Sequence, residues 1–350
     1  MMGPGTLEAK VVPLSKTEEV SDILFIRKET GPQIPKVNYI TLGKLGGVKI
    51  FHWVISPLIV LKETIRFKPA VLISYHIIPY GFFVGLVGLI TKTPYVIGQT
   101  GLMIQKQAKH KLFRQFLYFI FKYSFQVNCP GTKSVEYWGS IFPKLQGKFK
   151  VLHSTIDSSY FKSDEKVPKK YDFIFLGRLH RVKNIDIILQ GFAHLVHKNT
   201  LLNHPTMVIV GNGPEEKKLR ALSLELGLES LVSFTGFISE PLKYLQESRF
   251  LVMDSDSEGL PTAMMQAMSC ELIPITSLVG NILDLVSDRE TGFVHIGKNV
   301  ESISEMMFFA LQKEEEALLK MRTACRKRVI NKHSHLFATT QWQEVLCKLS

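Results

Sequence analysis

The chain has 350 residues, and its 45% hydrophobic and 21% charged residues are the fractions of an ordinary globular protein. At this length it is expected to divide into two domains rather than to grow one core. The chain has four cysteines, Cys129, Cys270, Cys325 and Cys347, whose spacing is neither that of metal ligands nor that of a redox motif. This spacing argues against a zinc site or a disulfide-exchange site. The cysteines are instead expected to act as small hydrophobic side chains in a protein of a reducing compartment.

The formal net charge of +12 belongs entirely to the N-terminal half of the chain. Residues 1–160 hold 20 Lys and Arg against 8 Asp and Glu, whereas residues 161–350 hold 23 of each. Such an excess suits nucleic acid, an anionic membrane or an acidic substrate. Because no nucleic-acid fold signature accompanies it, an anionic membrane surface ranks first and no nucleic acid is expected.

The N-terminal half contains one long uncharged stretch, residues 69–91. It is long enough to span a bilayer, but its polar residues, prolines and glycines predict a short strand, a loop and a helix of about three turns instead. His76 follows the strand and could line a cleft, although a lone histidine there more often has a structural role. The first eight residues lack the basic and apolar regions of a signal peptide.

Two further segments of this half are expected to have regular structure. Residues 94–101 read as a strand with the loop after it. Residues 106–122 place Lys and Arg beside large apolar side chains, as in a basic amphipathic helix. Such a helix either lies among lipid headgroups or packs on a core with a solvated basic rim, and both readings stay open.

The polar stretch 153–170 is expected to cross between the domains. A strand at 171–176 then leads through a turn that contains Arg178 and Lys183 to a helix at 185–196. An Arg fork and a Lys point charge at one strand-helix junction can neutralise a diphosphate and hold it as a leaving group. The alternative is a basic loop that is merely solvated.

Two more apolar runs end in glycine, as buried parallel strands do before their loops. Residues 207–210 lead into Gly211 and Gly213, and residues 232–237 form the next run. Residues 215–226 between them have leucines at helical spacing. The order strand, helix, strand, helix, strand predicts βαβ units in a parallel sheet.

An apolar strand at 250–253 precedes the most informative turn of the chain, which holds Glu258 and Gly259. Pro261 suits the first turn of the helix that follows. Free N–H groups at a helix start, including those of Leu260 and Thr262, form a site for phosphate oxygens. A carboxylate beside a phosphate site repels the phosphate and is favourable only if it binds a neutral group such as sugar hydroxyls. The turn therefore predicts a nucleotide-sugar site.

These motifs together resemble the retaining glycosyltransferases of family 4, which have the two-domain GT-B fold. The residues that carry the resemblance lie at 177–184, 210–214, 234–237, 258–262 and 288–293. The similarity extends over roughly residues 69–295. It implies an α/β protein with two Rossmann-like domains whose parallel sheets face a central cleft.

The resemblance also implies how the chain is divided. Residues 1–160 would form an acceptor-binding Rossmann-like domain whose first strand is absent or built differently, because the opening is short for the family. Residues 161–335 would form the nucleotide-sugar-binding domain. Residues 336–350 would form a helix that crosses back to the N-terminal domain.

The same resemblance assigns the site residues. Catalysis would rest on Arg178, Lys183 and Glu258. The donor would contact residues at four turns, namely Gly177, Asn184, Gly211, Gly213, Phe237, Ile238, Gly259, Leu260, Pro261, Thr262 and Gln266. In the N-terminal cleft, the corresponding positions are His76, Thr100 and Gly101.

Three positions depart from the family pattern. Gln266 stands where a second glutamate is usual, Thr100 where a histidine is frequent, and Met103 where an aspartate is frequent. A glutamine amide can still bond to a ribose hydroxyl through its oxygen. The departures nevertheless keep one alternative open, a non-catalytic membrane-associated scaffold.

The function implied is retaining transfer of a hexosyl or N-acetylhexosaminyl group from a nucleotide-diphosphate sugar to a lipid-linked or glycan acceptor. The enzyme would be peripheral on the cytoplasmic face of the membrane. No metal or other cofactor is expected beside the nucleotide-sugar co-substrate, and Asp254 and Asp256 match a metal motif by spacing alone. A nucleotide-sugar epimerase on the same fold is the second alternative.

Overall fold

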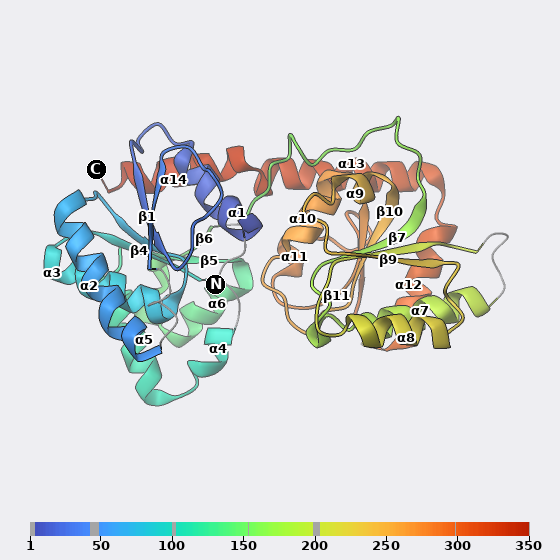
Figure 1. Ribbon diagram of the computed structural model, residues 1–350, viewed down its shortest axis with the longest axis horizontal. Helices are drawn as coiled ribbons and strands as arrows, with labels where there is room; N and C mark the ends of the chain where they lie inside the picture. Colours follow the sequence, from blue (N-terminus) through green and yellow to red (C-terminus); the bar gives the residue numbers. More distant parts are fainter. Residues whose placement is uncertain are drawn as a thin grey trace. The chain divides into compact units, whose positions relative to one another are not determined.

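The computed structural model of the chain describes residues 4–42, 49–99, 103–152, 154–198, 204–297 and 299–349. The chain divides into two compact units, Met1–Thr155 with His335–Ser350, and Ile156–Ser334 (Figure 1). Both units are built on parallel strands with helices packed on them, so the predicted α/β class is confirmed.

The second unit contains a six-stranded parallel sheet in the order β12-β11-β10-β7-β8-β9. The strands are β7 (Tyr171–Leu176), β8 (Met207–Val210), β9 (Val232–Gly236), β10 (Ser248–Met253), β11 (Ile273–Ser277) and β12 (Phe293–His295). Every residue of β8 is buried, as expected for a parallel strand covered on both faces. Counted from β7, the chain builds one half of the sheet outward and then returns to build the other half, which is the doubly wound order.

Helices cover both faces of this sheet. They are α7 (Ile185–His197), α8 (Glu216–Glu225), α9 (Leu242–Gln246), α10 (Thr262–Ser269), α11 (Ile282–Leu285), α12 (Val300–Gln312) and α13 (Glu315–His333). Helix α7 buries Ile185, Ile188, Leu189 and Phe192, a helical spacing that directs one face to the core. It packs against α12, whereas α10 packs against α13. The strands and helices predicted between residues 171 and 268 are confirmed to within a few residues.

The first unit contains two separate parallel sheets. The larger has the order β3-β4-β5-β6, with β3 (Leu72–Ser74), β4 (Tyr95–Gly98), β5 (Gln126–Cys129) and β6 (Phe149–Val151). The smaller pairs β1 (Ile23–Arg27) with β2 (Val37–Thr41). On the larger sheet, Val96 joins an apolar cluster with Leu14 and Trp342, whereas Ile97 joins a different cluster with Leu117. Neighbouring side chains of β4 are thus covered from opposite faces.

The helices of this unit include the last one of the chain. They are α1 (Pro4–Ser15), α2 (Lys49–Phe67), α3 (Phe82–Thr91), α4 (Met103–Gln107), α5 (Lys111–Tyr123), α6 (Thr132–Ile141) and α14 (His335–Cys347). Helix α14 packs against α1. The uncharged stretch 69–91 forms β3, a turn at Ile77–Gly81 and α3, as predicted. Across the described ranges, no helix is both long and apolar enough to cross a bilayer.

The prediction of one continuous helix over residues 106–122 is wrong. Helix α4 ends at Gln107 and α5 begins at Lys111, because the chain turns at the buried Ala108 and His110 has an extended backbone. Helix α5 then packs on the core through Leu117 and its neighbours while it leaves Leu112 83% exposed.

Candidate functional site

The strand order of the second unit changes direction between β7 and β10, and we call the region beyond the carboxyl ends of these two strands the crevice. These two strands pair with each other, yet the chain continues from β7 to β8 on one side and from β10 to β11 on the other. Turns that leave adjacent strands in opposite directions leave a gap between them, which is the usual ligand site of a doubly wound sheet. The first turn carries Lys183 and the second carries Glu258.

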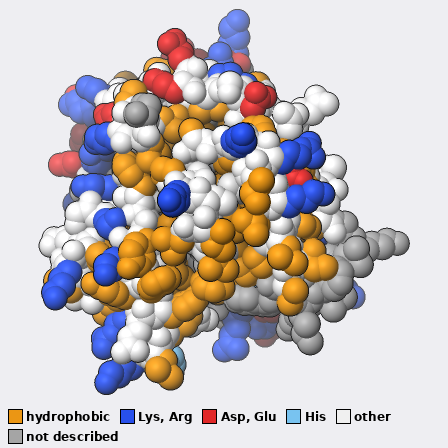
Figure 2. Space-filling view, turned by 90° about the vertical axis from the view of Figure 1, so that its left-hand side faces the viewer, with side chains coloured by type: hydrophobic (Ala, Val, Ile, Leu, Met, Phe, Trp, Pro, Cys, Tyr) orange, Lys and Arg blue, Asp and Glu red, His pale blue; other side chains and the backbone are white. Residues whose placement is uncertain are grey.

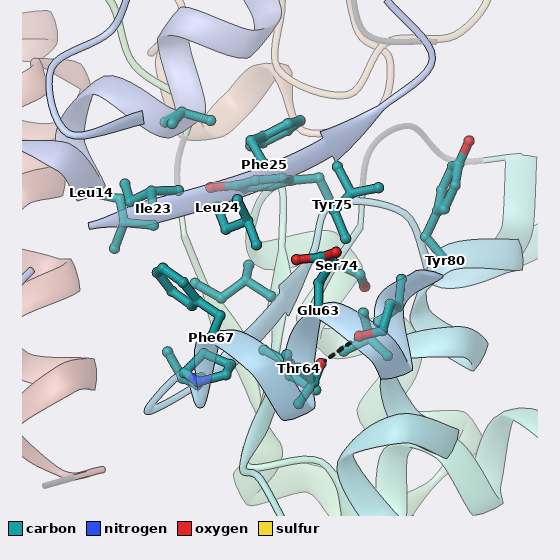
Figure 3. A pocket seen from close by; sticks show the side chains of 18 of the residues that line it. Leu14, Ile23, Leu24, Phe25, Glu63, Thr64, Phe67, Ser74, Tyr75 and Tyr80 are labelled. Carbon is teal, nitrogen blue, oxygen red and sulfur yellow. Dashed lines mark hydrogen bonds between the residues drawn. The ribbon is translucent and has the colours of Figure 1, made fainter. Parts of the chain in front are cut away.

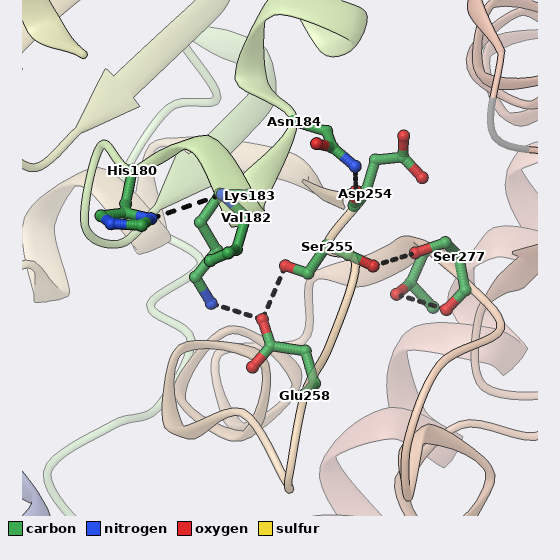
Figure 4. A network of polar contacts seen from close by, with 9 residues as sticks. His180, Val182, Lys183, Asn184, Asp254, Ser255, Glu258 and Ser277 are labelled. Carbon is green, nitrogen blue, oxygen red and sulfur yellow. Dashed lines mark hydrogen bonds and ion pairs between the residues drawn. The ribbon is translucent and has the colours of Figure 1, made fainter. Parts of the chain in front are cut away.

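An ion pair joins the two turns at this point (Figure 4). Lys183 Nζ donates to Glu258 Oε1, and Ser255 Oγ donates to the same oxygen at 2.6 Å. The two charged side chains are 20% and 12% exposed, so bulk water screens the pair only partly. Neither donor is directed to Glu258 Oε2, which leaves this oxygen as an acceptor for another group.

Asn184 fixes the spacing of the same two turns. Its Nδ2 donates to the backbone oxygen of Asp254 at 2.9 Å and to Asp256 Oδ1 at 3.0 Å. The backbone N–H of Asp256 donates to the Val182 oxygen at 2.8 Å. Asn184 also has a left-handed backbone conformation, with a φ of 48°, which asparagine tolerates better than most residues. Asn184 thus connects the two turns through its side-chain amide.

Arg178 differs from Lys183 in its surroundings. Its side chain is exposed, and among the described residues it forms no ion pair or hydrogen bond. The guanidinium therefore keeps its five donors for a ligand. Of the two cations predicted as catalytic after β7, one is thus held by a carboxylate and the other is open to solvent.

Glycines allow the turns after β7 and β8 to touch. A Cβ on Gly211 would lie 1.8 Å from the carbonyl oxygen of Gly177, and a Cβ on Gly213 would lie 2.2 Å from that of Leu179. Gly211 also has a φ of +141°, a conformation that residues with side chains rarely adopt. Close backbone approach thus requires glycine at positions 211 and 213, whereas a Cβ on Gly259 would meet nothing within 4 Å.

We expect Gly211→Ala to destabilise the second unit by about 3 kcal/mol or more, because backbone strain and a clash with fixed backbone atoms act together. Equilibrium unfolding in denaturant measures this change. The matched control is Gly259→Ala, since a Cβ there meets nothing within 4 Å. Equal stability of the two variants would contradict the close contact.

The helix after Glu258 begins one residue later than predicted. Pro261 is extended, with a ψ of 121°, and α10 starts at Thr262, so Pro261 lies just before the first turn rather than in it. No side chain caps this end of the helix. The first N–H groups of α10 therefore lack a partner within the helix and are available to phosphate oxygens.

The remaining predicted donor contacts surround the same carboxyl edge of the sheet. Gln266 is half-buried one turn along α10 from Thr262, so both lie on one face of the helix. Phe237 and Ile238 follow β9, and Phe237 is 70% exposed. Leu260 is buried and anchors the turn before α10.

A buried pair behind the crevice was not predicted from the sequence as a contact. Asp254 Oδ1 lies 3.4 Å from His295 Nε2, and both side chains are almost fully buried. His295 Nδ1 lies 2.7 Å from the Gly297 oxygen. The pair links the turn after β10 to the end of β12. Within the ranges described above, no three His, Cys, Asp or Glu side chains gather as metal ligands would.

The predicted residues of the N-terminal half have a different status. His76 follows β3 in the first unit, and burial lowers the pKa of its imidazole. Thr100 and Gly101 lie outside the described residues, as does the side chain of Met103.

Comparison with known proteins adds an independent line of information. The family model of the glycosyl transferases group 1 matches residues 157–331. An uncharacterized glycosyltransferase of Methanocaldococcus jannaschii is 25% identical over 238 residues, which cover 62% of this chain and 57% of that protein. The Campylobacter jejuni N-acetylgalactosamine-N,N'-diacetylbacillosaminyl-diphospho-undecaprenol 4-alpha-N-acetylgalactosaminyltransferase is 31% identical over 159 residues, or 44% and 41% of the two chains. The chain spans about half the length of the curated relatives it matches.

Solved structures resemble nearly the whole chain. The crystal structure of Anabaena HepE in complex with UDP-glucose matches with a TM-score of 0.77 at 15% identity, covering 99% of this chain and 97% of that one. Sucrose-phosphate synthase from Thermosynechococcus elongatus matches with a TM-score of 0.76 at 16% identity, covering 94% and 88%. Identities this low show the fold alone, and they confirm the predicted two-domain GT-B fold.

Proposed function

The chain belongs to the glycosyl transferases group 1 family, and on that premise we propose that it transfers a sugar from a nucleotide-diphosphate sugar to an acceptor with retention at the anomeric carbon. The observation that carries the proposal is the Lys183–Glu258 pair at the crevice between the turns after β7 and β10. A cation, a carboxylate and an uncapped helix start meet there. These are the groups that a sugar bonded to a diphosphate requires.

The cations act on the leaving group. As the bond between sugar and diphosphate breaks, negative charge accumulates on the diphosphate oxygens. Lys183, Arg178 and the first N–H groups of α10 stabilise that charge, and they are already in position before the reaction. The exposed guanidinium of Arg178 can donate hydrogen bonds to two diphosphate oxygens at once.

The carboxylate acts on the sugar. Glu258 Oε1 already accepts from Lys183 and Ser255, so Oε2 is the oxygen that accepts from a sugar hydroxyl. Lys183 then lies between the carboxylate and the diphosphate and offsets their repulsion. Gln266, on the next turn of α10, bonds to the ribose through its amide.

Two substitutions separate these roles. We expect Glu258→Gln to lower kcat by about 10- to 100-fold with little change in nucleotide affinity, because it removes a charge-assisted hydrogen bond to the sugar. Gln266→Glu is expected to change the nucleotide Kd more than kcat, since it places a carboxylate at the proposed ribose contact. Steady-state kinetics and calorimetric titration with the free nucleotide measure the two effects. A harmless Glu258→Gln together with an inactive Gln266→Glu would reverse the assignment.

The function itself is tested first by thermal shift against nucleotide sugars. A donor at about 100 times its Kd stabilises the native state by about 2.7 kcal/mol. The donor found is then supplied with an acceptor panel while nucleotide release and product stereochemistry are followed. Isomerised sugar without nucleotide release would identify an epimerase, and binding without any turnover would identify a scaffold.

The acceptor side of the proposal rests on one surface of the first unit, the α2–α3–α5 face. It is defined by exposed apolar side chains on helices that contact one another in that order. These side chains are Val54, Leu58, Ile65, Phe67, Leu86, Leu89, Ile90, Leu112, Phe119 and Tyr123. Figure 2 views the side that carries α2 and α3 and shows a broad hydrophobic patch with Lys and Arg around it.

The charges on this face have one sign. Exposed cations include Lys62, Arg66, Lys111, Arg114 and Lys122, whereas the sole acidic residue of the three helices, Glu63, is buried. Apolar side chains ringed by cations suit the headgroup region of an anionic bilayer.

We therefore propose that the first unit docks peripherally on the cytoplasmic face of a membrane and receives a lipid-linked acceptor there. The name of the Campylobacter jejuni relative, which includes diphospho-undecaprenol, supports a lipid-linked acceptor over a free glycan.

A further inference from the structure

Two carboxylates are buried within the described part of the chain, and their surroundings differ. Glu63 of the first unit points into a pocket of about 650 Å³, which has room for water, and its Oε2 lies 3.7 Å from Arg66 Nη1 (Figure 3). Asp254 of the second unit has no exposed surface, and its Oδ1 lies 3.4 Å from His295 Nε2. A carboxylate buried in this way costs free energy of folding unless its partners compensate for the lost water.

One proton makes the contact between Asp254 and His295 attractive. His295 Nδ1 lies 2.7 Å from the Gly297 backbone oxygen, and because a carbonyl oxygen only accepts, Nδ1 is the donor. The other ring nitrogen, Nε2, faces Asp254 Oδ1. An ionised carboxylate also only accepts, so a proton must lie on Nε2 or on the carboxyl group. Both ring nitrogens are then engaged, which fixes the orientation of the imidazole.

The pair connects two strands that do not pair with each other. Asp254 follows β10, His295 is the last residue of β12, and β11 lies between them. Ser277 of β11 is in register with His295, and its Oγ donates to the Ser255 oxygen at 3.2 Å. On the other side, the Asp254 backbone oxygen accepts from Asn184 Nδ2 at 2.9 Å (Figure 4). The start of the turn after β10 is thus held from the ends of β11 and β12 and from the turn after β7.

The residues held in this way are next to the one that orients Glu258. Ser255 follows Asp254 directly, and its Oγ donates to Glu258 Oε1 at 2.6 Å. A shift of Asp254 would therefore move Ser255, and with it the hydrogen bond that leaves Glu258 Oε2 for a ligand. A misplacement of about 1 Å at a reacting centre can lower a rate by about 100-fold.

Stability is a weak reason for such a pair. Apolar residues of similar volume in place of a buried ion pair often leave stability unchanged or raise it. An ion pair with a hydrogen-bonded imidazole instead restricts both side chains to one geometry, because any other geometry leaves a buried polar atom without its partner. The pair is thus better suited to orienting the turn than to stabilising the fold.

We propose that Asp254 and His295 are positioning residues for sugar transfer. Together they hold the turn after β10 so that Ser255 fixes Glu258 Oε1 and Oε2 meets the donor sugar. Neither side chain contacts the substrate, since both act through Ser255 and Glu258. The inference rests on the proposed function, because Glu258 is assigned to the sugar there.

Two substitutions at position 254 separate orientation from burial. Asp254→Asn keeps the shape of the side chain, and its amide N–H can donate to Nε2 of a neutral imidazole, so kcat should stay within about threefold of the wild-type value. Asp254→Leu keeps the branched shape but offers no hydrogen bond, so kcat should fall by about 10- to 100-fold while the nucleotide Kd changes less than about threefold. Initial rates and calorimetric titration measure the two quantities. Equal kcat values of the two variants would overturn the proposal.

A second pair of variants at position 295 decides the matter if Asp254→Leu does not fold, which circular dichroism checks. His295→Gln places an amide N–H near the position of Nε2, whereas His295→Asn places one near that of Nδ1. His295→Gln can therefore still donate to Asp254, and its kcat should exceed that of His295→Asn by about tenfold or more. Equal kcat values of these two variants would also overturn the proposal.

A double-mutant cycle shows whether Asp254 acts through Glu258. In the Glu258→Gln background, the turn has no carboxylate to present, so Asp254→Leu should lower kcat by less than about threefold further. If Asp254→Leu lowers kcat by the same factor in both backgrounds, it acts through a general loss of structure and the proposal is wrong.

Hydrogen exchange separates this proposal from the proposed function, because it needs no activity. Backbone amides of residues 255–260 should exchange about tenfold or more faster in Asp254→Leu than in the wild type or in Asp254→Asn, whereas those of β8 should not change. A wild type that transfers no sugar but shows this difference would reject the proposed function and still support the anchoring of the turn. Unchanged exchange at residues 255–260 in Asp254→Leu would overturn the anchoring whatever the activity.

Discussion

Lys183→Ala is expected to lower kcat/KM for sugar transfer by about 30- to 1,000-fold, which corresponds to about 2–4 kcal/mol of lost transition-state stabilisation. The loss has two sources. The variant removes the cation that balances the negative charge of the leaving diphosphate. It also leaves the Glu258 carboxylate, which is 12% exposed, beside the diphosphate without a cationic partner. Initial rates of nucleotide release at saturating donor measure the effect.

Arg178→Ala should cause a loss of similar size for a simpler reason, because no carboxylate pairs with it among the described residues. The matched control is Arg181→Ala, since Arg181 is an exposed cation on the same turn that is assigned no ligand contact. If all three variants lose activity equally, the turn contributes only general positive charge. If Lys183→Ala retains near wild-type turnover, its assignment to the diphosphate is wrong.

A double-mutant cycle distinguishes the two cations further. Lys183→Ala and Glu258→Gln should be strongly non-additive, because the two side chains contact each other directly. Arg178→Ala and Glu258→Gln should be nearly additive. Additivity in the first pair would mean that the ion pair separates when the donor binds.

Much of the second unit follows from local sequence. The runs at 171–176 and 207–210 are apolar except for Asp172 and end at glycine, and the structure places β7 and β8 there. Most of their side chains are buried, as expected for strands that are covered on two faces, so burial determines their apolar positions. The glycine positions follow as well, because only glycine permits the contact between Gly211 and Gly177.

The contacts within the site could not be predicted in the same way. Lys183 and Glu258 are separated by 75 positions, and only the strand order, with β7 beside β10, brings their turns together. The role of Asn184 was missed for the same reason, because its partners Asp254 and Asp256 lie on the other turn. Ser255 was open to prediction, since it lies only three residues before Glu258.

The break between α4 and α5 shows a different limit. Residues 106–122 have a continuous amphipathic pattern, and the turn at Ala108 is fixed by burial of that small side chain rather than by a glycine or proline. An amphipathic pattern along one segment indicates which face packs on the core, but it does not indicate where the segment turns. The same limit applies to the α2–α3–α5 face, because its apolar residues come from three helices that only the fold brings together.

Neutralising the basic rim of that face is expected to release the protein from anionic vesicles. The variant changes to Gln three cations of α5, Lys111, Arg114 and Lys122, and Lys109, which lies two residues before this helix; all four are exposed. Each cation near an anionic surface contributes about 1 kcal/mol, so the four together should lower the partition coefficient by about 10²–10³-fold at low salt. Sedimentation with phosphatidylserine vesicles at low and high salt measures the change, and the wild-type protein should lose most of its binding at high salt.

The matched control removes the same number of charges from the second unit, at the exposed Lys217, Lys218, Lys243 and Lys320. These residues make at most surface ion pairs, so their loss should affect neither stability nor vesicle binding greatly. Donor binding should be unchanged in the rim variant, because the proposed donor site lies in the other unit. Replacing the exposed Leu112 and Phe119 by Ser tests the apolar part, and it should weaken binding to neutral vesicles as well. If the rim variant and its control partition equally onto anionic vesicles, net charge, and not the α2–α3–α5 face, directs the protein to the membrane. If the wild-type protein binds to neither kind of vesicle, the face is only a solvated surface.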